Sequence, residues 1–272
     1  MRWAALTAVA LSLLAAQPAD DLTTIKLNGM DCGPDGIATS KPGKALNRLK
    51  NRYQPPGEDD IDPDVSLPAL LAPGYDVGRF DTKRAATLRG YVVRVMVGGN
   101  RETCNCGATR PNERDTHIEV ALAKDAPETQ RVIVEVTPRG RKQNGAGWTT
   151  QALKRKFEGK WVEVTGWLLF DTMHVNQAEN TNPGGEGNWR ATCWEVHPVT
   201  AIQEAGEPDT AAAFRPQSFA AVQKLHAAHV ARVPKGRDAV KKRNEGLLKG
   251  FDKKELEEAE EEAKERQPGR TP

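Results

Sequence analysis

The sequence predicts a mainly β protein built on a five-stranded, OB-fold-like Greek-key barrel with a helical tail. Three strand patterns come first, then one capped helix, then two more strand patterns, which is the element order of an OB-fold. Aromatic residues make up only 6% of the 272 residues and gather in the middle of the chain, so we expect the core there. The rival, an open α+β sandwich, lacks a second helix within the strand region to cover a sheet.

The first three strands are predicted between residues 88 and 139. The stretch LRGYVVRVMVGG alternates in the way of a strand, and Gly90 within it indicates the bend that a small barrel imposes. DTHIEVALA and RVIVEVTPR follow with the same period of two. The residues expected to face the interior from these two strands are Ile118, Val120, Leu122, Val132, Val134 and Val136. Those on the opposite face of the second strand are Asp115, His117 and Glu119.

A short helix is predicted between the third and fourth strands, after a basic loop, GRKQNGAG. Thr149 is the expected N-cap, and Trp148 is placed to pack on Leu153. Leu153 and Phe157 form an i,i+4 apolar pair, and Gly159 ends the helix.

The last two strands are predicted in KWVEVTGWLLF and WRATCWEVHPVTAI. In the fifth strand, a period of two puts Cys193, Glu195 and His197 on one face, opposite Trp194 and Val196. Between the two strands lies a polar loop, residues 176–188, which is longer than a hairpin needs. Such loops are often functional, but this one names no ligand.

The N-terminal residues predict export. Residues 1–19 combine a basic start, a short apolar run and small residues, as in a secretory signal peptide. The run is too short for a comfortable membrane span, so we expect a periplasmic or extracellular protein. Residues 20–84 are rich in Pro, Gly and Asp and predict a lead-in segment without its own core, although KALNRLKNR favours two helical turns. The barrel is assigned to residues 85–203.

Residues 204–272 predict a linker and a charged helical tail. SFAAVQKLHAAHVARV has apolar residues at helical spacing and is expected to pack on the barrel. Residues 237–266 are helix-prone and strongly charged, so we expect a solvated helix or, as the alternative, an arm that binds a protein partner. The formal net charge of +2 provides no global field that would recruit nucleic acid or an anionic membrane.

The four cysteines predict disulfides, because an exported chain meets an oxidising compartment. They are Cys32, Cys104, Cys106 and Cys193. Cys104 and Cys106 are too close in sequence to bond each other readily, which makes Cys193 a candidate partner and lets Cys32 tie the lead-in segment to the barrel. The pairing stays open, and a zinc site lacks the paired spacings of structural zinc motifs.

Polar residues near the strand ends form a candidate metal site. Asp115 and His117 share one face of the second strand, and His197 lies on the polar face of the fifth. Asp171 and His174 follow the fourth strand. If these groups converge, they suit zinc and related divalent ions, which activate water for hydrolysis. The alternative is a set of structural His–carboxylate pairs, since no compact His-x-x-x-His spacing occurs. No other cofactor is predicted.

A ligand-binding face is the second candidate site, because OB-folds bind oligonucleotides or oligosaccharides on the barrel face and nearby loops. Basic residues with interleaved aromatics suit a single-stranded nucleic acid, and tryptophan alone suits a sugar. The candidate ligand-binding residues are Trp148, Trp167, Trp189, Arg139, Arg141 and Lys142. The alternative is that the tryptophans are packing residues and the charges a solvated face.

The strand region contains the stretches DTHIEV, VEVTPR, GKWVEVTGWLLFD followed by His174, and RATCWEVHPVT. These four stretches resemble a family of exported bacterial OB-fold-like proteins without an assigned activity. The resemblance covers roughly residues 88–202 and implies the fold and export, but no catalytic residues. The secreted thermonuclease type of OB-fold carries acidic and arginine motifs that this chain lacks.

The function that the sequence favours is therefore an exported, non-catalytic binding or interaction module for an oligonucleotide or oligosaccharide. The alternative is a metal-dependent hydrolase or nuclease that uses the His/Asp cluster. The sequence contains no nucleophile elbow, phosphate loop, dinucleotide fingerprint or His-Glu-x-x-His motif.

Overall fold

The structure is a computed structural model that describes residues 22–207 and 236–266. The predicted signal peptide and the predicted helix around residues 218–233 lie outside the described residues. None of the described helices is both long and apolar enough to cross a membrane.

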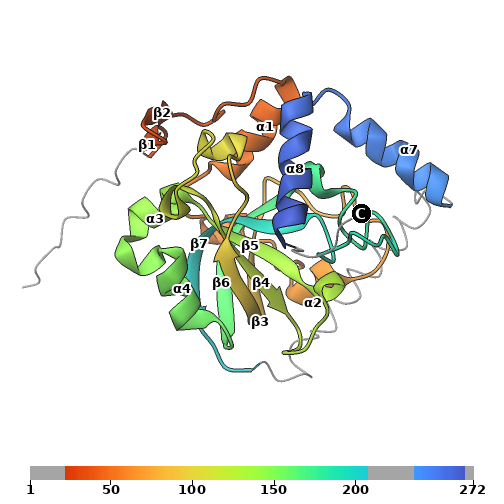
Figure 1. Ribbon diagram of the computed structural model, residues 1–272. Coiled ribbons are helices and arrows are strands. Elements are labelled where there is room, and N and C mark those ends of the chain that lie inside the picture. Colours follow the sequence, from red (N-terminus) through yellow and green to blue (C-terminus); the bar gives the residue numbers. More distant parts are fainter. Residues whose placement is uncertain (1–21, 208–235, 267–272) are drawn as a thin grey trace, which may run out of the picture.

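Five strands form a closed barrel, as the sequence predicts (Figure 1). They are β3 (Ala85–Val97), β4 (Thr116–Ala121), β5 (Val132–Val136), β6 (Trp161–Phe170) and β7 (Trp194–Glu204). The order around the barrel is β3-β4-β5-β7-β6. The β5–β7 pair is parallel, and the other pairs are antiparallel. The topology is OB-like. The first strand begins earlier than predicted, at Ala85, and the last begins later, at Trp194.

The barrel interior is apolar and follows the predicted alternation. Ile118, Val134 and Val136 are fully buried in the main core. The prediction for Leu122 is wrong, because β4 ends at Ala121 and the Leu122 side chain is 37% exposed.

The predicted irregularity in the first strand lies just past Gly90. The register between β3 and β4 shifts between Val92 and Arg94. Because of this bulge, Val92 and Val95 are both buried although they are three positions apart, and the strand curves. At Gly90 itself, a Cβ atom would come within 2.6 Å of Leu67 Cδ2, so glycine allows helix α2 (Leu67–Leu71) to pack against the strand.

Two helices connect β5 and β6 where the sequence predicts one. Helix α4 (Thr150–Phe157) matches the prediction, and the Thr149 hydroxyl accepts a hydrogen bond from the Ala152 amide. The predicted basic loop before it is instead mostly helix α3 (Pro138–Asn144). Thr137 caps this helix and Pro138 occupies its first position, a start signal that the sequence already carried.

The lead-in segment forms a hairpin and two helices, one of which is the short helix α2. Strands β1 (Ile25–Leu27) and β2 (Met30–Cys32) pair, and helix α1 (Lys41–Lys50) contains the predicted helical turns. A disulfide between Cys32 and Cys106 ties the hairpin to the loop after β3 and lies in a small apolar cluster.

The prediction that all four cysteines form disulfides is wrong. Cys104 and Cys193 are free and buried. Cys193 packs with Val175 and Ala178 under the long loop, in an apolar cluster distinct from the one around the disulfide.

The C-terminal segment folds into helices α7 (Arg237–Leu248) and α8 (Lys253–Arg266). Figure 1 shows α8 lying across one end of the barrel, beside β5. The expectation of a solvated helix is wrong for α8, because Glu255, Ala259, Glu262 and Arg266 are buried. Its charged residues contact the barrel, as described next.

Candidate functional site

The outward face of β4, β5 and β7 carries buried polar side chains at one end of the barrel. His117, Glu135 and His197 are at most 3% exposed, although they point away from the apolar core. They alternate along their strands with Ile118, Val134 and Val196, which face inward. Helix α8 contacts His117, the end of α1 contacts Asp171, and the loop after β3 contacts Asp115 at the same end of the barrel.

We call this group the rim cluster. It consists of Glu102, Cys104, Asp115, His117, Glu135, Asp171, His174, Glu195 and His197, all buried. The five predicted metal-site residues belong to it, so the structure brings together the strand ends as the sequence suggested.

His197 is held by two carboxylates on one side of its ring. Its Nδ1 lies 3.3 Å from Glu195 Oε2 and 3.4 Å from Glu135 Oε2. Burial disfavours the charged imidazole, but Glu135, Glu195 and Asp115 together raise the pKa of His197. On the other side of the ring, Nε2 has no hydrogen-bond partner and lies 3.8 Å from Asp115 Oδ2.

The other two histidines are joined through a carboxylate of α8. Glu262 lies 3.3 Å from His117 Nδ1 and 3.3 Å from His174 Nε2. His117 Nε2 lies 2.9 Å from Glu135, which links it to His197. The three histidines therefore connect through Glu135 and Glu262.

Two permanent cations lie within the cluster. Lys50 Nζ is 2.7 Å from Asp171, and Arg190 is 2.6 Å from Glu195. Burial opposes ionisation of Asp171, yet Lys50 and His174 hold its pKa below its usual range. Lys50 stays protonated because Asp171 and other acids outweigh its burial and raise its pKa.

The cluster holds more acid than these cations balance. Its five carboxyl groups face two permanent cations, and burial raises the pKa of both Glu102 and Glu135 well above the ordinary range. Burying unbalanced charge is expensive, so the excess must be neutralised by protons or by a bound cation.

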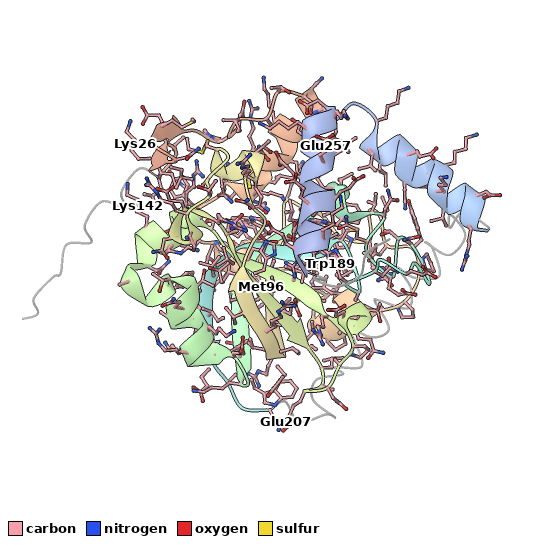
Figure 2. All side chains as sticks on the ribbon, in the orientation of Figure 1. Lys26, Met96, Lys142, Trp189, Glu207 and Glu257 are labelled. Atoms are coloured by element: carbon pink, nitrogen blue, oxygen red, sulfur yellow. A yellow bond between two sulfur atoms is a disulfide. The ribbon has the colours of Figure 1, made fainter. Side chains whose placement is uncertain are left out.

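Helix α8 closes the cluster by polar contacts. The Arg266 guanidinium lies over the Trp189 ring, 3.9 Å from its centroid. Figure 2 shows Trp189 beside the end of this helix. It donates a hydrogen bond to Glu119 at 3.1 Å and contacts His117. Burial lowers the pKa of Arg266 to about 9.

Three groups of side chains in the described residues are close enough to share a metal ion. They are Asp115–Glu135–His197, Glu102–Cys104–Asp115 and Asp171–His174–Glu195, and within each the ligand atoms lie within 4.8 Å of one another. The third is the weakest candidate, because Lys50 and Arg190 already neutralise two of its members. The predicted metal residues are thus spread over the three groups, with Asp115 in two of them, and His117 belongs to none.

The structure does not support two of the predicted ligand-binding arginines. Arg139 is fully buried and donates to the carbonyl groups of Leu22, Cys32 and Gly33, so it fastens the N-terminal hairpin. Arg141 donates to the carbonyls of Trp148, Asn112 and Arg114. A guanidinium has no spare donors for a phosphate when carbonyl groups engage it in this way.

The remaining predicted ligand-binding residues are dispersed. Trp189 is buried beneath α8, and Trp148 packs against the main core. Trp167 donates to the Gln54 carbonyl and lies 5.0 Å from the Arg52 guanidinium. Lys142 is exposed on α3. These side chains do not form one continuous basic and aromatic surface.

Sequence reasoning missed Glu102, Cys104, Glu135, Glu195 and Lys50 as site residues. Glu135 offered the clearest signal, because it is a single carboxylate within the apolar stretch VIVEV. Cys104 was assigned to a disulfide, and Lys50 comes from a helix that only the fold brings to the barrel.

No known protein-family model matches this chain, and no curated protein matches it either. The site must therefore be interpreted from its own chemistry.

Proposed function

We propose that this protein is an exported metal-binding protein whose barrel rim holds a divalent transition-metal ion between Asp115, Glu135 and His197. The observation that carries the proposal is that ligand atoms of these three buried side chains lie within 4.8 Å of one another, and that His197 Nε2 is buried there without a hydrogen-bond partner. Buried polar atoms of this kind are rare in native proteins and point to a missing partner.

The geometry suits an ion. Ligand atoms about 2.0–2.2 Å from a tetrahedral zinc ion lie roughly 3.4 Å from one another. The 3.8 Å between His197 Nε2 and Asp115 Oδ2 is too long for a hydrogen bond and needs only a small adjustment to accept a metal. One imidazole with carboxylates is a common donor set for zinc and its neighbours.

The surroundings of His197 also fit a metal ligand. Metal-binding histidines usually donate their second ring N–H to a carboxylate, which fixes the ring and its tautomer. Glu195 lies at that position beside His197 Nδ1, and Arg190 in turn fixes Glu195. A divalent ion would also offset the excess of carboxylates in the rim cluster.

Export is part of the same proposal. The disulfide between Cys32 and Cys106 suits an oxidising compartment. The predicted signal peptide at residues 1–19 supports the same location, and the resemblance to exported OB-fold-like proteins agrees with it.

Metal-dependent hydrolysis is a second candidate. Structural metal sites are closed, whereas catalytic ones keep an open position for water or substrate. The rim cluster is closed here, but the cover uses charged residues of α8, Glu262 and Arg266, and not a large apolar surface. Water can replace polar contacts of this kind, which favours movement of α8 away from the rim cluster.

Binding of an oligonucleotide or a saccharide remains a weaker prediction. Trp167 and Lys142 retain accessible surface, but they support it only as separate contacts. A gel shift with single-stranded DNA at low salt, where electrostatic binding is strongest, tests the nucleic-acid version.

The deciding experiment is metal analysis of the mature, full-length protein after exposure to Zn²⁺ and removal of free ion. We expect stoichiometric zinc in the wild type and in Asp64→Asn, whose carboxyl group is exposed. We expect at least about ten-fold weaker binding in His197→Ala and Asp115→Asn. Equal zinc content in all four proteins, or none in the wild type, would refute the proposal.

A further inference from the structure

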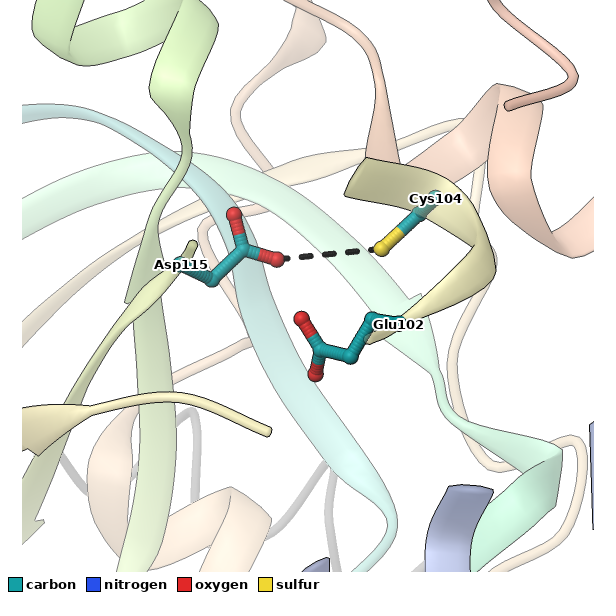
Figure 3. A group of neighbouring side chains, drawn as sticks. All are labelled: Glu102, Cys104 and Asp115. Carbon is teal, nitrogen blue, oxygen red and sulfur yellow. Dashed lines mark hydrogen bonds between the residues drawn. The ribbon is translucent and has the colours of Figure 1, made fainter. Parts of the chain in front are cut away.

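The loop after β3 brings a free thiol into the rim cluster. Cys106 of this loop is bonded to Cys32, whereas Cys104, two residues earlier, has no disulfide partner and is 2% exposed. In Figure 3 the Cys104 sulfur and the carboxyl groups of Glu102 and Asp115 point toward one another. The Cys104 Sγ lies 3.8 Å from Asp115 Oδ2.

One amide group holds the two carboxylates together. Asn105 Nδ2 donates to Glu102 Oε2 at 2.8 Å and to Asp115 Oδ2 at 2.9 Å. Two carboxylates normally repel, so this shared donor fixes a pair that would otherwise separate. The second oxygen of Asp115, Oδ1, remains buried without a partner.

Asp115 belongs to two of the three groups that could hold an ion. It shares one with Glu135 and His197 and the other with Glu102 and Cys104. Asp115 Oδ2 lies 3.8 Å from both Cys104 Sγ and His197 Nε2, so this carboxyl group faces both groups at once. A carboxylate has enough lone pairs to bind two ions.

The local composition also suits a cation. Glu102 and Asp115 are two buried carboxyl groups beside the Cys104 thiol. The ammonium group of Lys50 is already paired with Asp171.

We propose that Glu102, Cys104 and Asp115 bind a second divalent ion, and that Asp115 bridges it to the ion held by Glu135 and His197. This inference rests on the proposed metal-binding function. Zinc is the expected ion, because thiolate, carboxylate and imidazole groups are its usual ligands. On binding, the Cys104 thiol loses its proton to solvent and its sulfur forms the bond to the metal.

A bridged pair of ions carries a consequence for substrate class. Two ions about 3.5–4 Å apart clamp the attacking and leaving oxygens of phosphate esters in phosphatases and nucleases. If α8 lifts, a phosphate ester is therefore the substrate class that this centre fits.

Cobalt titration of the mature, full-length protein tests the inference, because thiolate ligation gives Co²⁺ a charge-transfer band in the near ultraviolet. We expect two ions per chain and this band in the wild type. Cys104→Ser should remove the band and reduce the content to one ion. Cys193→Ser is the matched control, since it changes the other free, buried cysteine, which lies in an apolar cluster.

The outcomes separate the two proposals. One ion without the charge-transfer band, lost in His197→Ala, overturns the second site and leaves the proposed function standing. One ion with the band, retained in His197→Ala, supports the Cys104 site and refutes the ligand set of the proposed function. A wild type that takes up no ion refutes both. Circular dichroism of each variant establishes that a lost ion does not reflect unfolding.

Discussion

The two faces of the same barrel strands are equally buried but chemically opposite. On β4, β5 and β7, Ile118, Val134 and Val196 point inward and are inaccessible to solvent. On the outward face the neighbouring His117 and Glu135 are at most 3% exposed. The apolar face is buried because removing apolar surface from water is favourable. The polar face is buried because α8, α1 and two loops cover it.

This difference matters because only one face stabilises the fold by being buried. Each fully buried aliphatic side chain contributes about 1.5–3 kcal/mol. Buried charges carry a desolvation penalty that pairing offsets only when the geometry is good. The five buried carboxyl groups of the rim therefore do not stabilise the fold in the way that the apolar face does, and they mark the rim as a candidate functional site.

The largest expected effect concerns the Arg190–Glu195 pair, whose side chains are inaccessible and 2.6 Å apart. Glu195→Gln leaves the Arg190 charge buried without its partner, which should cost about 4 kcal/mol of unfolding free energy. Urea unfolding at pH 7 measures it. The control, Glu163→Gln, breaks an exposed pair with Arg89 and should cost less than about 1 kcal/mol. Similar values for both variants would show that the rim is not desolvated.

The interior face should respond differently. Ile118→Ala removes a fully buried side chain from the main core and should cost about 3 kcal/mol. Because no charge is involved, we expect the same loss at pH 5 and pH 8, measured by urea unfolding. A loss that varies strongly with pH would mean that the two faces are coupled.

Glu258 of α8 should make the free energy of unfolding depend on pH. Burial raises its pKa from 4.5 to about 7, so the folded protein keeps a proton that the unfolded chain releases. The stability this proton provides is complete below about pH 4.5 and is lost as the pH rises through about 7. Glu258→Gln should therefore stabilise the protein by up to about 2 kcal/mol at pH 8 and leave it unchanged at pH 4.

Thermal unfolding at the two pH values measures the Glu258 effect. The control is Glu260→Gln, on the exposed side of the same helix, which should not change the thermal stability at either pH. A Glu258→Gln variant that is no more stable than the wild type at pH 8 would contradict a raised pKa for Glu258.

The smallest effect is kinetic and concerns the cover. Glu262→Gln combined with Arg266→Gln removes the charged contacts of α8 with the rim and should speed metal loss to a chelator about ten-fold, or about 1.4 kcal/mol in barrier. The matched control is Glu261→Gln with Lys264→Gln, an acid and a base on the exposed face of the same helix. Equal release rates would mean that α8 does not control access.

Part of the rim could be predicted from strand periodicity alone. A period of two placed Asp115, His117 and His197 on outward faces, and the structure confirms that these faces lie together. The same periodicity did not identify Glu135, because the valines around it indicate a strand whose side chains pack in the core. It also misassigned Arg139, whose buried contacts with the N-terminal hairpin depend on residues more than a hundred positions away.

The sequence by itself determined the barrel, the capped helix between its third and fourth strands and the apolar interior, because alternation and capping are local signals. The tertiary structure alone decided that the outward faces are buried, that Cys104 is free, and that α8 covers the rim. These features depend on contacts between segments that are distant in the sequence. The charge pattern of α8 alone predicts a solvated helix, because it does not reveal the buried charges that the helix contacts. The proposed metal site is formed by these long-range contacts.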